Sequence, residues 1–155
     1  MSQLVESLLH EASAGRMLNA SFVARFSPSS LREAIQELVG QERFDMADAL
    51  VDAGLALHPE SEDILAIGSL VAMVRQEWVQ SIELLTKLML VQDGNVQPFT
   101  HVMMVRSLRS NLDPAAALAA TVSGLNQYPD HAELLIEQAD LFEMAGMAND
   151  SVAIN

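Results

Sequence analysis

The stretch that decides the fold is residues 44–59, FDMADALVDAGLALHP, because its arrangement of residue types returns at 78–93, WVQSIELLTKLMLVQD, and at 114–129, PAAALAATVSGLNQYP. The fourth position of each segment is small, and the series continues once more, at spacings of 34, 36 and 34 residues: Ala47, Ser81, Ala117 and Ser151. A fixed period of this length is typical of helical hairpins that stack into a solenoid. Such a solenoid usually works as a binding surface.

Apolar spacing and helix-end signals predict where the helices of these units lie. Ser30 and Glu33 have the S-x-x-E spacing of a capping box, in which each side chain accepts a backbone N–H of the first turn. Asp113-Pro114 is a second start signal, because aspartate caps and proline fits a first-turn position. The predicted helices span residues 30–40, 46–57, 63–75, 78–91, 98–109, 114–127 and 130–144. Gly146 is the stop signal of the last helix.

The N-terminal region precedes the periodic part. Residues 3–14 are predicted to form an amphipathic helix, and residues 17–29 fit either a short helix or an ordered linker. A lone helix of about a dozen residues is marginal in water, so its apolar face must dock on its own chain or on a second copy. We predict a homodimer in which the self-association face is Leu4, Val5, Leu8 and Leu9.

The repeated positions resemble the tetratricopeptide repeat (TPR) family. The first unit matches its pattern at Leu31, Ala34, Leu38, Phe44, Ala47, Val51, Gly54-Leu55 and Pro59; the second at Leu65, Gly68, Ala72, Trp78, Ser81, Leu85, Leu88 and Asp93. The third matches at His101, Met104, Leu108, Pro114, Ala117, Thr121, Gly124-Leu125 and Pro129, and a partial fourth at Leu135, Ala139, Phe142, Gly146 and Ser151. The chain departs from the family at the hairpin turn, where the usual glycine is Glu42, Gln76 or Leu112.

The resemblance implies an all-α, right-handed TPR-like solenoid of antiparallel helix pairs with an extra N-terminal helix. Residues 1–27 would hold that helix and a linker, and residues 28–155 the repeats, divided at about 28–61, 62–95, 98–131 and a partial 132–155. The layout of a short N-terminal helix, a linker and three units in a small acidic chain also looks like bacterial type III secretion chaperones.

Composition narrows the classes of partner. The 155 residues carry a net charge of −13, which disfavours nucleic acid and anionic membranes as partners because both would repel the chain. The absence of cysteine leaves no disulfide and no thiolate metal site. The first residues lack the basic and apolar regions of a secretory signal, and we expect a cytoplasmic protein that crosses no membrane.

The sequence carries no pattern of catalytic or metal-binding chemistry, so we expect neither an enzyme nor a cofactor. None of the four histidines has a second ligand at helical spacing, and no phosphate loop or nucleophile elbow is present. Four carboxylates at i, i+3, i+7 and i+10 are typical of a solvated outer helix face, with docking of a basic partner as the other interpretation: Asp130, Glu133, Glu137 and Asp140. No Lys or Arg follows Arg109 to oppose them.

In TPR folds the first helix of each pair lines a groove, and this resemblance implies the binding positions here. They are Arg32, Gln36 and Val39 in the first unit, Ala66, Leu70 and Met73 in the second, and Val102, Arg106 and Arg109 in the third. An apolar centre with arginines at one side would suit a peptide that has hydrophobic anchors and an acidic group. We predict a cytosolic chaperone that caps a type III secretion substrate in this groove. A scaffold joining protein partners, or a non-catalytic regulatory subunit of an enzyme, remains the alternative.

Overall fold

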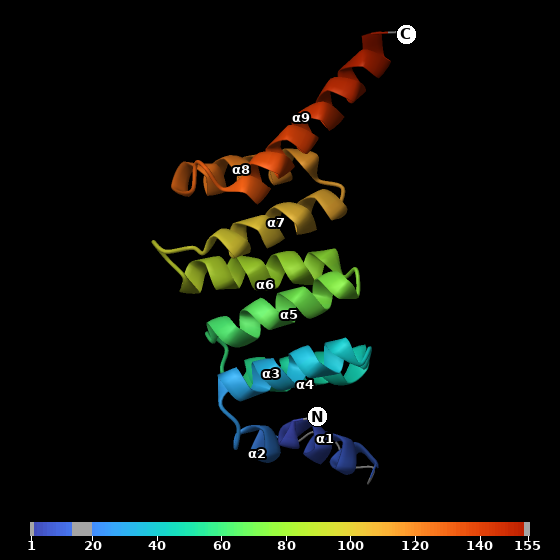
Figure 1. Ribbon diagram of the computed structural model, residues 1–155, viewed down its shortest axis with the longest axis vertical. Helices are drawn as coiled ribbons and strands as arrows, with labels where there is room; N and C mark the ends of the chain where they lie inside the picture. Colours follow the sequence, from blue (N-terminus) through green and yellow to red (C-terminus); the bar gives the residue numbers. More distant parts are fainter. Residues whose placement is uncertain (1, 14–19, 154–155) are drawn as a thin grey trace. The chain divides into compact units, whose positions relative to one another are not determined.

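The computed structural model describes the backbone of residues 2–13 and 20–153, and the side chains of residues 2–10 and 21–146. The described residues form helices and turns, with no strand among them. The chain divides into two compact units, Met1–Val91 and Gln92–Asn155. From residue 20 on, the successive helices within each unit are joined by short turns (Figure 1).

The first unit contains two antiparallel helix pairs preceded by a short N-terminal segment. Its helices are α1 (Gln3–Ser13), α2 (Ala20–Val23), α3 (Pro28–Gly40), α4 (Phe44–Leu57), α5 (Glu62–Val74) and α6 (Trp78–Val91). Helix α3 pairs with α4 and α5 pairs with α6, while α5 also packs against α3 and α4. These contacts make two hairpins that share one apolar core.

The second unit contains a third pair and one further long helix. Its helices are α7 (Pro98–Ser110), α8 (Pro114–Gln127) and α9 (Ala132–Ala153). Helix α7 pairs with α8, and α9 packs against both of them. We call the first helix of each pair (α3, α5, α7 and, by position, α9) an A helix and its partner (α4, α6 and α8) a B helix. The A and B helices are those that the sequence period predicts.

The start of α3 differs from the sequence prediction. Ser27, and not Ser30, is the N-cap: its hydroxyl accepts a hydrogen bond from the N–H of Ser30 at 3.1 Å, and Pro28 occupies the first turn. Proline fits there because its missing N–H has no helical partner to lose. The Asp113 cap of α8 is confirmed, since its carboxylate accepts from the N–H of Ala116.

The hairpin turns repeat one strained residue. Glu42, Gln76 and Leu112 have φ values of 58°, 61° and 61°, in the left-handed region that glycine normally occupies. At each turn, the N–H of that residue and the N–H of the next one bond to carbonyls of the preceding A helix, as Glu42 does to Val39 and Arg43 to Leu38. This is the helix-ending pattern that usually selects glycine. At these three turns, where the sequence departs from the TPR pattern, a residue other than glycine therefore adopts the backbone conformation that glycine usually has.

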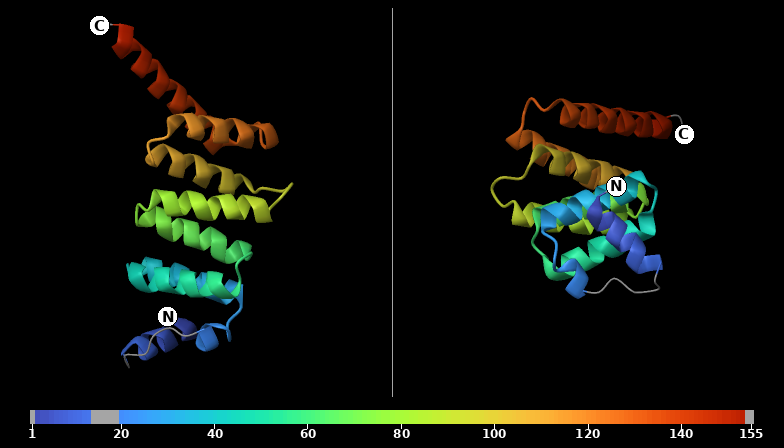
Figure 2. Two further views of the ribbon diagram at one scale, coloured as in Figure 1. Left: turned by 180° about the vertical axis from the view of Figure 1, so that it is seen from behind. Right: turned by 60° about the horizontal axis from the view of Figure 1, so that its bottom comes forward.

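The end of α9 also differs from the prediction. The helix was expected to stop at Gly146, but it runs on to Ala153. By the repeat period Gly146 corresponds to Glu42, Gln76 and Leu112, so it holds the turn position of a fourth hairpin. In Figures 1 and 2, the C-terminal turns of α9 project beyond α8 with no B helix beside them.

The small residues lie where helices approach most closely. Three residues of the repeated small position, Ala47, Ser81 and Ala117, are fully buried. Gly54 and Gly124 are equally tight, since a Cβ added to either would come within 2.9 Å of a neighbouring A-helix side chain, Ile64 or Leu134. Small residues therefore set the distance between neighbouring helices.

The apolar face of α1 is covered by its own chain. Leu4, Val5 and Leu8 are buried in the core of the first unit, and Leu9 packs at its edge. Helix α1 lies against α3 (Figure 2), and the N–H of Ser2 bonds to both carboxylate oxygens of Glu37. The hydrogen bond from the Ser2 backbone lowers the pKa of Glu37. Of the two docking modes predicted for this helix, the structure shows docking on its own chain, and self-association stays a prediction.

Replacing the strained turn residue Leu112 with glycine should stabilise the protein. The Leu112 side chain is 88% exposed, so little packing is lost when it is removed. We expect Leu112→Gly to raise the free energy of unfolding by about 0.5–1 kcal/mol, measured by urea unfolding followed by circular dichroism. Gly94→Ala is the opposite control, because Gly94 has a φ of 74° and alanine there should destabilise. A loss of stability for Leu112→Gly would show that the turn is not strained.

Enlarging the small residue of a helix crossing should destabilise its hairpin. Ala47→Leu and Ala117→Leu each force a larger side chain into a fully buried contact, and we expect a cost of about 1–3 kcal/mol by thermal unfolding. The exposed position Ala115 on α8 is the matched control, and Ala115→Leu should leave the melting temperature nearly unchanged. Equal melting temperatures for all three variants would mean that the repeat register is misplaced.

Candidate functional site

In the first unit, the groove positions predicted on α3 and α5 lie at the surface. Arg32 and Gln36 are exposed, and Ala66 and Met73 are half-buried. Val39 and Leu70 are also half-buried and pack against the edge of the core. Val39 and Met73 hold equivalent repeat positions on α3 and α5, which pack together, so the apolar members of this set lie on two neighbouring A helices. We call this set of six residues the α3–α5 face.

One ion pair borders the α3–α5 face. The Nη1 atom of Arg32 lies 3.2 Å from Oδ1 of Asp63 on the neighbouring A helix, with both side chains close to half exposed. Such a pair contributes little to stability in water. It leaves Arg32 partly neutralised, and the rest of the face is uncharged.

The groove positions predicted on α7, in the compact unit of residues 92–155, are placed differently. Val102 is fully buried in the core between α7, α8 and α9, so it lines no surface. The two arginines contact α9. Arg106 Nε lies 2.9 Å from Glu137 Oε1 and its Nη2 lies 3.0 Å from Glu133 Oε2; Arg109 Nη1 lies 2.7 Å from Glu137 Oε2 and 3.5 Å from Asp140 Oδ2.

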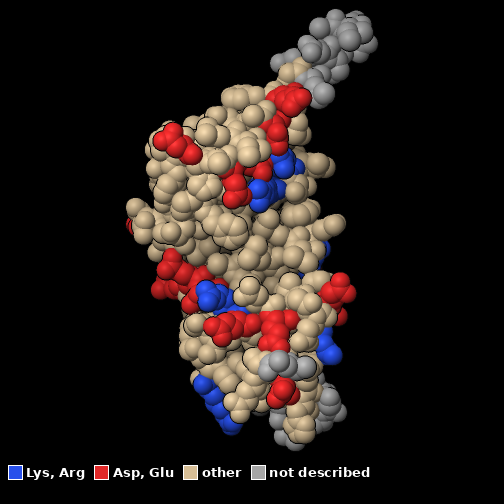
Figure 3. All heavy atoms as spheres, viewed as in Figure 1, with Lys and Arg blue, Asp and Glu red and all other residues tan. Residues whose placement is uncertain are grey.

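This network corrects the interpretation of the acidic run as a solvated outer face at one residue: Glu137 is only 4% exposed, whereas Asp130, Glu133 and Asp140 are exposed as that interpretation predicts. Arg106 and Arg109 pair with three of the four carboxylates: Glu133, Glu137 and Asp140. The hydrogen bond that Arg106 donates to Glu137 raises the pKa of the Arg106 guanidinium. Figure 3 shows basic and acidic side chains side by side near the base of α9. The two arginines are therefore engaged within the unit and do not form a free basic rim for a client.

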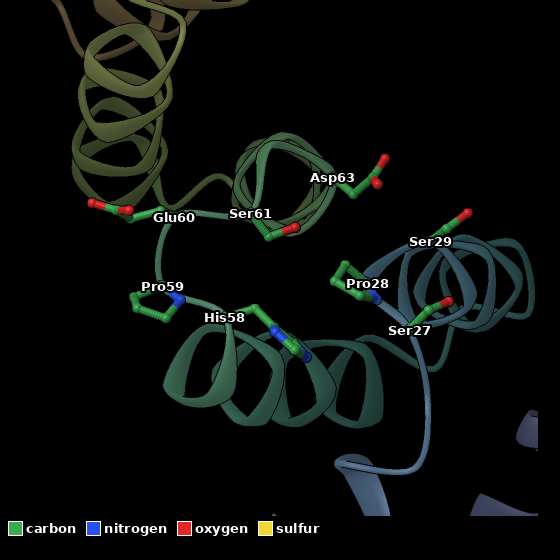
Figure 4. A pocket seen from close by; sticks show the side chains of 8 residues that line it. All are labelled: Ser27, Pro28, Ser29, His58, Pro59, Glu60, Ser61 and Asp63. Atoms are coloured by element: carbon green, nitrogen blue, oxygen red, sulfur yellow. The ribbon is translucent and has the colours of Figure 1, made fainter.

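An open hollow of about 530 Å³ lies between the start of α3 and the α4–α5 connection (Figure 4). Its charged groups do not converge: Glu60 and Asp63 point to opposite sides, while the His58 ring and the Ser61 hydroxyl lie toward the middle. The hydroxyls of Ser27 and Ser61 already cap α3 and α5. The arrangement offers no pair of groups placed for acid–base or nucleophilic chemistry.

One buried histidine has a structural partner on the neighbouring helix. His101 of α7 is buried, and its Nε2 lies 3.1 Å from Oε1 of Gln127 on α8. Within the described residues no three His, Asp or Glu side chains gather in a way that could hold a metal ion. No helix in the described part of the chain is long and apolar enough to cross a membrane.

Sequence reasoning missed an apolar surface on α9. Leu135 and Phe142 are 43% and 55% exposed, and Ala139 between them is exposed too. We call these three residues the α9 stripe. Separately, a hollow of about 430 Å³ between α8 and α9 is lined by side chains that are all apolar: Pro114, Ala115, Leu118, Leu141, Met144 and Ala145. The repeat alignment contains the signal for the stripe, because the stripe positions are those that face a B helix, and no B helix follows α9 among the residues that the structure describes.

Solved structures with the same arrangement of helices are TPR proteins. YrrB, described as a TPR protein with an unusual peptide-binding site, superposes with a TM-score of 0.63 at 15% identity, over 79% of this chain and 62% of that one. MamA from MSR-1 gives 0.68 at 16% identity, over 97% and 89%. Acl4, the assembly chaperone of RpL4, gives 0.59 at 15% identity, over 96% and 59%.

The fold is a TPR-like solenoid. At these identities the likeness concerns the fold alone, and this chain spans less than two thirds of YrrB and Acl4. No protein-family model and no curated protein matches the sequence.

Removing the charge of Glu137 should destabilise the second unit. In Glu137→Gln the amide keeps the shape, but two guanidinium groups lose their shared anion. Both arginine side chains are partly exposed, so water compensates in part, and we expect a loss of about 1–2 kcal/mol by urea unfolding. Glu143→Gln on the same helix is the matched control, because Glu143 is exposed. Equal losses in the two variants would show that the network contributes nothing specific.

Proposed function

We propose that this chain is a protein-binding module, a cytosolic chaperone that caps an apolar segment of a type III secretion substrate. The observation that carries the proposal is the α3–α5 face, where Val39, Leu70 and Met73 lie partly exposed on neighbouring A helices of a TPR-like solenoid. Partly exposed apolar side chains beside polar ones suit an extended or helical peptide.

The chemistry of the face favours an apolar client segment. Methionine side chains are flexible and adapt their shape to different partners, so Met73 suits contact with an apolar segment. Arg32 is already paired with Asp63, so charge supplies less of the binding free energy than the groove arginines were expected to supply. The net charge of −13 keeps the complex in solution and favours clients that are neutral or basic.

The secretion role rests on layout and on analogy. A small acidic chain with an N-terminal helix docked on the first of its hairpins resembles the chaperones of that system in its organisation. Acl4 is an example of a chaperone with this fold, and YrrB of a peptide-binding site on it. A homodimer formed through α1 would require this helix to leave its place on α3, and light scattering of the purified chain measures whether it does.

The rival function is a scaffold that joins folded proteins, or a non-catalytic regulatory subunit. A chaperone holds one unfolded or partly folded client, whereas a scaffold binds short peptides of folded partners reversibly. Recovery of the tagged chain from its own cells, followed by mass spectrometry, separates them by what is bound. A secretion substrate recovered in stoichiometric amount supports the chaperone; folded proteins of other pathways support the scaffold.

Charged substitutions on the α3–α5 face should release the client. Met73→Asp places a carboxylate against the apolar segment of the client without a partner, and we expect the recovered client to fall by about tenfold or more. Leu70→Asp should act in the same direction. Leu90→Asp is the matched control, because Leu90 is an exposed apolar residue of α6 outside the face. Circular dichroism checks that all three variants fold. Full recovery of the client by the folded Met73→Asp and Leu70→Asp variants would rule out this face.

A further inference from the structure

The repeat shows what the α9 stripe is built to contact. Its residues hold the same repeat positions as three sets on the earlier A helices: Leu31, Ile35 and Leu38 on α3, Leu65, Ser69 and Ala72 on α5, and His101, Val105 and Leu108 on α7. All of these are buried except Leu108, which is partly buried. The contacts of Gly54 with Leu31 and of Gly124 with His101 show that these positions face the B helix of the same hairpin.

On α9 this face has no helix to cover it in the described part of the chain. Leu135 is exposed where Leu31, Leu65 and His101 are buried, and Phe142 is exposed where Leu38 and Ala72 are buried. Each B helix that covers the equivalent face in the other hairpins is 14 residues long. The shape of the vacant surface is therefore that of a seat for a helix of about this length.

Charge decides which kind of helix fits. Residues 92–155 contain eight acidic and only two basic side chains, and the two basic ones are the arginines already paired with α9. Glu143 is exposed beside the stripe. A second copy of α9 would bring further acidic residues to this surface and be repelled, whereas a helix with basic flanks would be attracted.

We propose that the α9 stripe binds an amphipathic helix of a partner protein, whose apolar face is flanked by lysine or arginine. The partner helix takes the place of a fourth B helix and packs its small and apolar residues on Leu135, Ala139 and Phe142. This surface is separate in its residues from the α3–α5 face, so the proposal stands whether or not the chain is a secretion chaperone.

The test uses a synthetic peptide as the probe and the full chain as its receptor. The peptide is 14 residues long, as α6 is. It keeps the buried residues of α6 and has lysine at the outer positions; the residues kept are Ser81, Leu84, Leu85 and Leu88. Fluorescence anisotropy at low salt should show saturable binding. Phe142→Asp should weaken it by about tenfold or more. Val122→Asp is the control, because Val122 on α8 is similarly exposed, at 44%, and lies outside the seat; it should bind within about twofold of wild type.

A second peptide with glutamate in place of lysine tests the charge argument. It should bind at least about tenfold more weakly at low salt, and the difference should shrink as salt screens the charges. The proposal is overturned if the lysine peptide shows no saturable binding, if the folded Phe142→Asp variant binds it as well as wild type, or if both peptides bind equally at low salt.

Two further measurements distinguish the other occupants of the seat. Gly146→Ala favours the continuous α9 helix over a turn at this residue. If this variant binds the lysine peptide about tenfold more tightly than wild type, residues 147–155 of the same chain compete for the seat, and they replace the partner as its occupant. If light scattering gives a dimer that Phe142→Asp converts to a monomer, a second copy is the occupant. Either result overturns the proposal, and a monomer with unchanged affinity in Gly146→Ala supports it.

Discussion

Close contact between helices at small residues is the constraint on which the rest of the structure depends. Gly68 shows it most directly: a Cβ on this α5 residue would lie 2.9 Å from Val51 of α4 and 3.4 Å from Leu84 of α6. Such spacing lets the large residues of neighbouring helices interlock around the crossing. It also fixes which side of each A helix is buried, and therefore which side is left to bind a partner.

The sequence predicted most of the fold because its determinants are local or periodic. Small residues at a regular spacing, together with caps such as Asp113, locate the hairpins without any knowledge of distant contacts. The prediction was wrong where two neighbouring residues could both form the same local structure, as at the start of α3. Ser27 and Ser30 are both able to cap a helix, and only the fit of Pro28 in the first turn selects Ser27.

The candidate site was less predictable, because it depends on contacts between residues far apart in the sequence. Glu137 belongs to a run of acidic residues that looks solvated, yet its partners Arg106 and Arg109 lie about one repeat earlier. Their pairing changes three inferences together: it buries Glu137, it removes the free basic rim, and it ties α9 to α7. By contrast, the apolar positions of α3 and α5 needed only the register of the repeat to be placed at the surface.

The turn residues show that tertiary contact decides where a helix ends, and the turn residue only assists. Glu42, Gln76 and Leu112 adopt a left-handed conformation that costs about 1–2 kcal/mol. The chain tolerates this cost because the turn lets a B helix pack on the preceding A helix, and that packing offsets the strain. Gly146 could make the same turn at little cost, yet α9 continues through it. Glycine inside a helix costs only about 1 kcal/mol, whereas a turn would break helical hydrogen bonds without a packed helix in return. The exposed α9 stripe and the uninterrupted α9 helix are thus two consequences of one missing contact.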